Sequence, residues 1–141
     1  MSASTVRLIT GLVLLVHGIG YALAFFPALN ITKVANWNYQ SWLLSGTVGD
    51  TASRVIVIIL FGIPFIGFIA AGLGIFNFLV PHEWWQTLAI VSAIVGLIAL
   101  ALFWNAFPSL FPNKIGAIVV NVLVVWALLG TNELSKMMVN I

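Results

Sequence analysis

The stretch of sequence that decides the fold is VIVIILFGIPFIGFIAAGLGIFNFLV, residues 55–80. None of these residues is charged, and the segment is longer than the ~20 residues that a helix needs to cross the hydrocarbon core of a bilayer. Because that core holds no water to satisfy backbone N–H and C=O groups, the segment is predicted to be an α-helix.

Three further segments have the same character: residues 8–29, 84–107 and 115–130. None of them contains Asp, Glu, Lys or Arg. The sequence therefore predicts an all-α, polytopic membrane protein: a four-helix transmembrane bundle that forms one domain over residues 1–141, with both termini on the same side. The first apolar run is longer than the hydrophobic region of a signal peptide, so we expect a retained helix.

The composition excludes the soluble classes of protein. Only 5 Lys or Arg and 3 Asp or Glu occur among 141 residues, or 6%, against about 25% in an ordinary soluble domain. A water-soluble enzyme and a nucleic-acid-binding protein are both excluded, and the lipid bilayer is the expected partner. Cysteine is absent, so there is no thiol nucleophile or cysteine-ligated metal.

The connections between the spans differ. Residues 30–53 are predicted to form an amphipathic loop that lies on the membrane face or caps the bundle, because they include five large apolar side chains: Trp37, Tyr39, Trp42, Leu43 and Leu44. Asp50 or Ser53 is the expected N-cap of the second helix. Residues 81–83 predict a tight hairpin. Two interfacial aromatic belts are expected, one of Trp84, Trp85 and Trp126 and the other of Trp37, Trp42 and Trp104.

Small residues four apart predict where the helices meet, because close backbone approach drives helix association in lipid. Such pairs occur in the first three spans, as in Gly67 and Ala71 or Ser92 and Gly96. The second span is the richest in glycine and also contains Pro64. We therefore expect this span to pack against the others, with Pro64 kinking it or drawing it into the bundle. The same small residues could serve a homo-oligomer instead.

Polar residues at depth are the candidate site, because polar groups inside a membrane are expensive and tend to be functional. His17 lies nine residues into the first span, or roughly 14 Å at 1.5 Å per residue, and Asn121 lies at a similar depth in the fourth. Tyr21 shares a helical stripe with His17, and Ser92 lies in the third span. The set of ligand-binding or interior polar residues is thus His17, Tyr21, Ser92 and Asn121.

Two hypotheses compete for His17. In the structural one, a neutral imidazole bonds Asn121, Ser92 or a backbone carbonyl and holds two helices together. In the functional one, it donates a hydrogen bond or exchanges a proton with a quinone, a lipid headgroup or another apolar ligand. Haem is not expected, because His82 lies at the membrane face and the methionines lie outside the spans. No metal site and no catalytic residues are predicted.

One resemblance bears on the fold. Arg7-Leu8-Ile9-Thr10-Gly11, followed by Leu15-Val16-His17-Gly18, resembles the first helix of the DoxX-like family of small four-helix prokaryotic membrane proteins. The length and the four-span layout are also similar to that family. The resemblance implies a prokaryotic plasma membrane and, by analogy with some members, association with quinone-linked oxidoreductase complexes. Many members carry a basic residue shortly after the helix-one glycine, where this chain has Gly20-Tyr21.

The expected function is that of a non-catalytic accessory subunit, within a larger membrane complex, or a bundle that binds a lipid or quinone. One alternative is an oligomeric channel or facilitator for a small solute, lined by Asn77, Asn105 and Asn121. Another is a membrane component of a quinone-linked oxidoreductase, which would need a redox partner. Positive charges are split evenly between the two sides, so the sequence favours neither membrane orientation.

Overall fold

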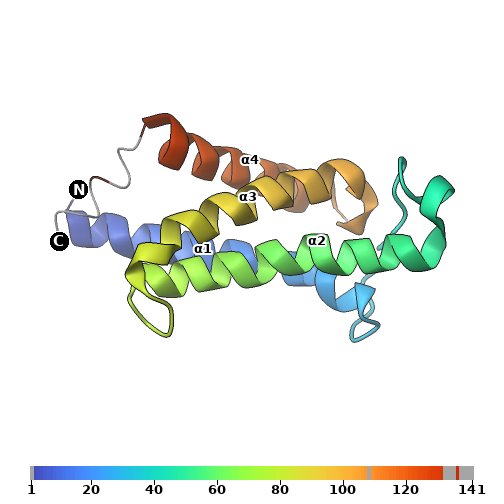
Figure 1. The fold of residues 1–141 in the computed structure, drawn as a ribbon, viewed down its shortest axis with the longest axis horizontal. Coiled ribbons are helices and arrows are strands. Elements are labelled where there is room, and N and C mark those ends of the chain that lie inside the picture. The colour runs from blue at the N-terminus through green and yellow to red at the C-terminus, as the bar shows by residue number, and fades with distance from the viewer. Residues whose placement is uncertain (1, 108, 132–135, 137–141) are drawn as a thin grey trace.

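Four long helices form the molecule, as the sequence predicts. The computed structural model describes residues 2–107, 109–131 and 136, and this part of the chain contains no strand. The helices are α1 (Ala3–Ala28), α2 (Ser45–Ile75), α3 (Trp85–Leu102) and α4 (Ile115–Val125). Short turns η1 (His82–Trp84) and η3 (Leu110–Lys114) precede α3 and α4, η2 (Trp104–Ala106) follows α3, and η4 (Trp126–Thr131) extends α4. Figure 1 shows α1 beginning and α4 ending toward the same end of the bundle.

The exterior of the bundle is apolar on every helix, which identifies the chain as an integral membrane protein. Val16, Ile66, Ile98 and Val122 are all exposed, Val16 by 68%. Soluble proteins rarely expose apolar patches of this extent. Four helical segments, Ala3–Ala28, Ser45–Ile75, His82–Leu102 and Leu110–Thr131, are long and apolar enough to cross a bilayer. The chain is therefore a multi-pass membrane protein in contact with lipid.

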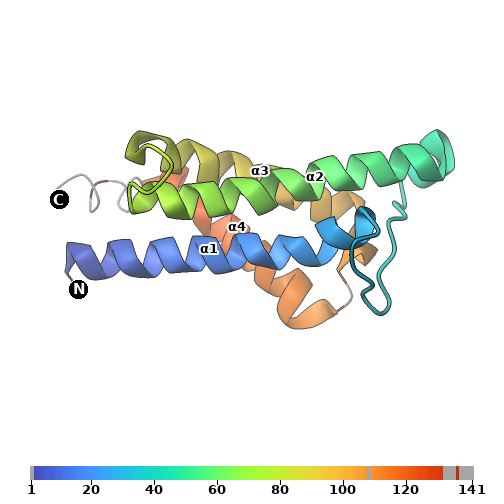
Figure 2. The same cartoon turned by 90° about the horizontal axis from the view of Figure 1, so that it is seen from below.

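Helices α1 and α2 make the most extensive contact in the molecule, and they run side by side in Figure 2. Glycines form this interface as expected: a Cβ on Gly72 would meet the side chain of Leu15, and one on Gly18 would meet Phe68 and Ile69. Helix α2 also packs along α3. Pro64 is buried, so it lies inside the bundle.

Two arginines join the α1–α2 pair, and each bonds a carbonyl at the C-terminal end of the other helix. Arg7, near the start of α1, donates from Nε to the carbonyl of Ile75 at the end of α2, at 2.7 Å. Arg54 of α2 donates from Nε to the carbonyl of Ala28 at the end of α1, at 2.6 Å. Each cation thus satisfies a terminal carbonyl at the negative end of a helix dipole.

Both of these helices end at an asparagine. After α1, Asn30 adopts a left-handed φ of 60°, and after α2, Asn77 adopts a φ of 54°. The N–H of Ile31 bonds the carbonyl of Phe26, and the N–H of Phe78 bonds that of Leu73, which completes a Schellman motif at each end. Helix α2 therefore stops at Ile75, although the apolar run continues to residue 80, and the hairpin before α3 is longer than expected.

The start of α2 also differs from the prediction. The loop expected over residues 30–53 is shorter, because the helix begins at Ser45. The hydroxyl of Ser41 accepts bonds from the N–H groups of Leu43 and Leu44 in the turn before the helix. The N-cap is Leu44, which makes no side-chain capping bond, rather than the expected Asp50 or Ser53. Buried Ser53 bonds the Ser45 hydroxyl instead. The break in α2 lies at Gly49, with φ 79° and ψ 169°, rather than at Pro64.

The first loop caps the bundle at the end of α3. Trp42 donates from Nε1 to the carbonyl of Ala101, at 2.7 Å, and the N–H of Asn38 bonds the carbonyl of Asn105. The loop thus satisfies a carbonyl that the next turn of α3 would have used. Helix α3 accordingly ends at Leu102 rather than at residue 107, and only the short turn η2 follows.

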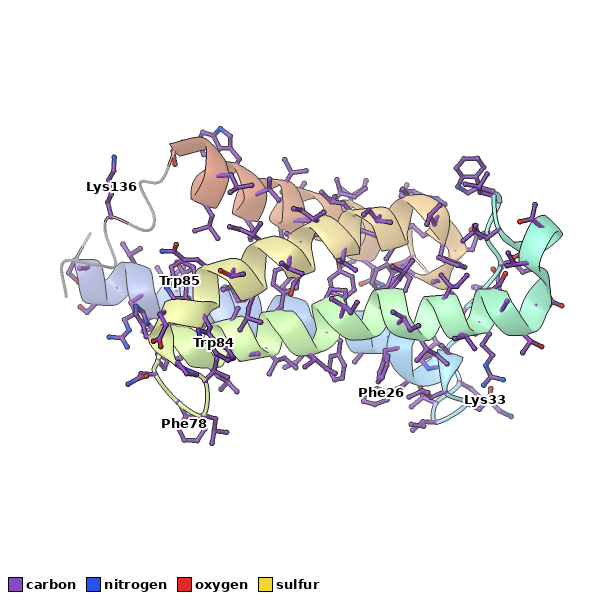
Figure 3. The ribbon with its side chains drawn as sticks, viewed as in Figure 1. Phe26, Lys33, Phe78, Trp84, Trp85 and Lys136 are labelled. Atoms are coloured by element: carbon purple, nitrogen blue, oxygen red, sulfur yellow. The ribbon has the colours of Figure 1, made fainter. Side chains whose placement is uncertain are left out.

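The aromatic belts differ from the prediction at Trp85 and at Trp37, which is half-buried against the core. Trp84, Trp126 and Trp42 are largely exposed, as belt residues should be. Trp85, however, is only 2% exposed and packs against Gly74, where the absence of a side chain makes room for it. Figure 3 shows Trp84 and Phe78 near one end of the bundle and Lys33 near the other.

Candidate functional site: a polar chain beside the α1–α4 cleft

Three of the predicted polar residues meet inside the bundle. His17 Nε2 lies 2.9 Å from Asn121 Oδ1, and Asn121 Nδ2 donates to the Tyr21 hydroxyl at 2.6 Å. Asn121 is fully buried and Tyr21 is 1% exposed. Residues 17 and 21 are one turn apart on α1, so both side chains reach the same position on α4. The result is a continuous chain of hydrogen bonds, His17–Asn121–Tyr21, which joins α1 to α4.

Aromatic rings enclose the Tyr21 end of this chain. The ring of Tyr21 lies 6.0 Å from that of Phe61, 6.1 Å from that of Phe68 and 5.7 Å from that of Phe107, between centroids. Phe68 also meets the ring of His17 at 4.7 Å, edge to face. Such aromatic contacts fix the rings in position.

Gly96 of α3 completes the enclosure. A Cβ at this glycine would clash with the Tyr21 hydroxyl and lie 2.9 Å from Asn121 Nδ2. The missing side chain therefore makes room for the polar chain, so that it can sit against the backbone of α3. No residue larger than glycine fits at this position without displacing Tyr21 or Asn121.

The seam between α1 and α4 holds a cleft. The backbones of these two helices do not pack closely. A cavity of about 200 Å³ lies toward η3, with Gly20, Phe107, Pro112 and Gly116 among its lining residues. A second hollow of about 330 Å³ continues toward the start of α1, where Leu12 and Val13 line it. The two share Val16, His17 and Val120, so together they form one apolar cleft with His17 at its middle.

His17 is the polar residue that both hollows of this cleft share. Its Nε2 is engaged by Asn121. Its Nδ1 has no hydrogen-bond partner among the described residues. Among these residues, Trp37 Nε1 is the one buried side-chain nitrogen or oxygen without a partner. The unpartnered Nδ1 of His17 is therefore not buried. The imidazole therefore faces both ways, with one nitrogen bonded inside the bundle and the other available at the cleft.

The fourth predicted residue, Ser92, lies elsewhere. It is buried on α3, where its hydroxyl lies against Gly67 of α2. It borders a different apolar groove of about 550 Å³, between α2 and α3. The structure thus brings together His17, Tyr21 and Asn121 but not Ser92.

The asparagines expected to line a pore are far apart in the fold. Asn77 ends α2 and is exposed, Asn105 lies in η2 near the opposite end of the bundle, and Asn121 is buried in the hydrogen-bonded chain. A path between copies of the chain would therefore not reach Asn121, which is 0% exposed.

The two histidines are also separate. His82 Nδ1 bonds the carbonyl of Gly74 at the end of α2, at 3.0 Å, whereas His17 lies within the bundle. Among the described residues, no three His, Cys, Asp or Glu side chains group so as to hold a metal ion.

Sequence reasoning missed the supporting residues. Phe61, Phe68 and Phe107 are ordinary apolar residues of the spans, and only the packing shows that they surround Tyr21. Gly96 did carry a signal, because it is paired with Ser92 at a spacing of four residues. That spacing predicted a helix contact but not that the glycine makes room for a polar cluster.

Comparison with known proteins adds no further assignment. No protein-family model, curated protein or solved structure matches this chain.

Proposed function

We propose that this protein is a non-catalytic accessory membrane protein that binds an apolar molecule with a polar head in the α1–α4 cleft, with His17 bonding the head. The observation that carries the proposal is the position of His17, whose Nε2 is held by Asn121 while its Nδ1 is available at an apolar cleft. A histidine with a purely structural role would need no such cleft.

The cleft suits a lipid or a quinone. Its lining is apolar except around His17, Tyr21 and Asn113, and pockets for small ligands are typically apolar with a few placed polar groups. The larger hollow, between Leu12, Val13 and Val120, would hold an acyl or isoprenoid tail. The smaller cavity, bordered by Tyr21 and Phe107, would hold the head.

The partners follow from this ligand class. If the ligand is a quinone, its electrons must come from another protein, because the chain has no cysteine and its two histidines bond different parts of the bundle and so cannot ligate one haem together. The proposal therefore includes a larger membrane complex in a prokaryotic plasma membrane and membership of the DoxX-like family, supported by the Arg-Leu and His-Gly pattern of α1.

Two glycines make the proposal testable without damage to the fold. A Cβ at Gly116, which lines the smaller cavity, would meet no atom within 4 Å, and the same is true of Gly46, which lies outside both hollows. Gly116→Leu should therefore fill the cavity, whereas Gly46→Leu is the matched control at an open position.

The experiment measures retention of a benzoquinone with a ten-carbon tail by protein in nanodiscs, in competition with phosphatidylethanolamine. We expect the wild type and Gly46→Leu to retain one probe per chain and Gly116→Leu to retain at least tenfold less. Displacement by the phospholipid would favour a lipid as the natural ligand. Equal retention by Gly116→Leu would show that the probe binds elsewhere, and no retention by the wild type would refute the proposal.

A further inference from the structure

The centre of the polar chain is an amide that can face either way. Asn121 places one terminal atom 2.9 Å from His17 Nε2 and the other 2.6 Å from the Tyr21 hydroxyl. A half-turn about its Cβ–Cγ bond exchanges the carbonyl oxygen and the NH₂ group and leaves the side chain's shape almost unchanged. Both neighbours can act as donor or as acceptor, so the geometry accommodates two arrangements.

In the first arrangement, His17 donates from Nε2 to Oδ1, and Nδ2 donates to the Tyr21 oxygen. A neutral imidazole carries one proton, so Nδ1 is then bare and presents a lone pair to the cleft. The hydroxyl proton of Tyr21 then has no acceptor among the described residues, because the hydroxyl's bond there is the one that it accepts from Asn121 Nδ2.

In the second arrangement, the Tyr21 hydroxyl donates to Oδ1, and Nδ2 donates to a bare His17 Nε2. The imidazole proton then lies on Nδ1 and points to the cleft. Two internal hydrogen bonds are made in each arrangement, and the second also uses the Tyr21 proton. Neither arrangement places a net charge in the bundle, where no compensating acid lies in any span.

We propose that Asn121 is a hydrogen-bond switch that lets His17 offer the cleft either a lone pair or an N–H, so that the site binds both hydroxyl and carbonyl head groups. This inference rests on the proposed ligand-binding function. The change is balanced: water in the cleft gives one proton to Nδ1, and Nε2 gives one proton back to water when the turning amide of Asn121 breaks its bond to Nε2, so the net protonation of the imidazole is unchanged. The amide turns as the proton changes place.

The test uses nitrogen and carbon NMR of the full chain in nanodiscs. The chain has two histidines and two tyrosines, so His82→Gln and Tyr39→Phe assign the signals of His17 and Tyr21. The nitrogen spectrum of His17 distinguishes a protonated from a bare ring nitrogen, and the Cζ shift of Tyr21 responds to whether its hydroxyl donates. The probes are 2-undecanol and 2-undecanone, which share one carbon skeleton.

We expect the ketone to place the His17 proton on Nδ1 and the alcohol to place it on Nε2, with a matching change at Tyr21 each time. In Asn121→Leu the Tyr21 signal should no longer follow the ligand. If the His17 signals respond to both probes but the imidazole proton stays on one nitrogen, the switch proposal is wrong and the binding proposal stands. The same conclusion follows if the proton changes nitrogen while the Cζ shift of Tyr21 stays constant. If neither probe moves any His17 signal, both are overturned.

Discussion

Replacing Gly96 with alanine should break the polar chain at its most enclosed point. The new methyl group would clash with the Tyr21 hydroxyl and lie 2.9 Å from both Tyr21 Cζ and Asn121 Nδ2. Tyr21 has no open space to move into, because the rings of Phe61, Phe68 and Phe107 surround it. The added atom must therefore displace the tyrosine ring, the asparagine or helix α3 itself.

Three energetic contributions decide whether Gly96→Ala raises or lowers the free energy of unfolding. Overpacking a filled core costs about 1–3 kcal/mol, and the loss of an interhelical hydrogen bond in a membrane costs about 0.6 kcal/mol on average and up to about 1.7. Alanine in place of glycine favours the helix by at most about 1 kcal/mol. The free energy of unfolding should thus fall by about 0.5–4 kcal/mol.

SDS titration in mixed micelles, followed by far-ultraviolet circular dichroism, measures this change. Gly20→Ala is the matched control, because it also lies within a helix and borders the cleft but a Cβ there meets no atom within 4 Å; its stability should be unchanged or higher. Adding Tyr21→Phe to Gly96→Ala should recover part of the loss by removing the clashing hydroxyl. Equal stability of Gly96→Ala and Gly20→Ala would refute the placement of Tyr21 against α3.

Three further variants test the helix ends by the same titration. Arg54→Met should lower the free energy of unfolding by up to about 3 kcal/mol, because a hydrogen bond to a charged group is worth about 1.5–3 kcal/mol and Arg54 donates to the carbonyl of Ala28 at 2.6 Å. The control Lys33→Met, at an exposed position, should lower it little. Equal losses in the two variants would contradict the role of Arg54. Ser41→Ala should lose about 0.5–1.5 kcal/mol, because its hydroxyl accepts from the N–H groups of Leu43 and Leu44; no loss would mean that these bonds do not stabilise the turn before α2. Asn77→Val should lose about 1–2 kcal/mol because of its positive φ, and Asn77→Gly should not; similar values for the two would rule out the asparagine stop.

The core of the candidate site could be predicted because polar side chains inside lipid are few and must find one another. His17 and Asn121 lie at similar depths in two spans that contain no acid or strong base, and the structure joins them at 2.9 Å. Tyr21 followed from the one-turn spacing. Ser92 did not join them, because depth and spacing do not say which neighbour a helix face meets, and its face meets Gly67.

The helix ends were less predictable, for a physical reason. Hydropathy reports how much of a segment can lie in lipid, whereas a helix ends where its last carbonyls find other partners. The apolar run through residue 80 continues past Asn77, yet the left-handed asparagine ends α2. At α3, the partner comes from Trp42, which lies 59 positions away in the chain, so no local pattern could indicate it.

Helix α1 is held more firmly to α2 than to α4, and this difference bears on how a ligand could enter. Between α1 and α2, glycines let the backbones approach and two arginines bond the helix ends. Between α1 and α4, the backbones stay apart and the recorded polar contacts between described residues are the two bonds of Asn121. Such bonds average about 0.6 kcal/mol each in a membrane, close to the thermal energy. The seam that contains His17 should therefore open to lipid more readily than the α1–α2 seam, and the same two bonds that mark the site also set how easily it opens.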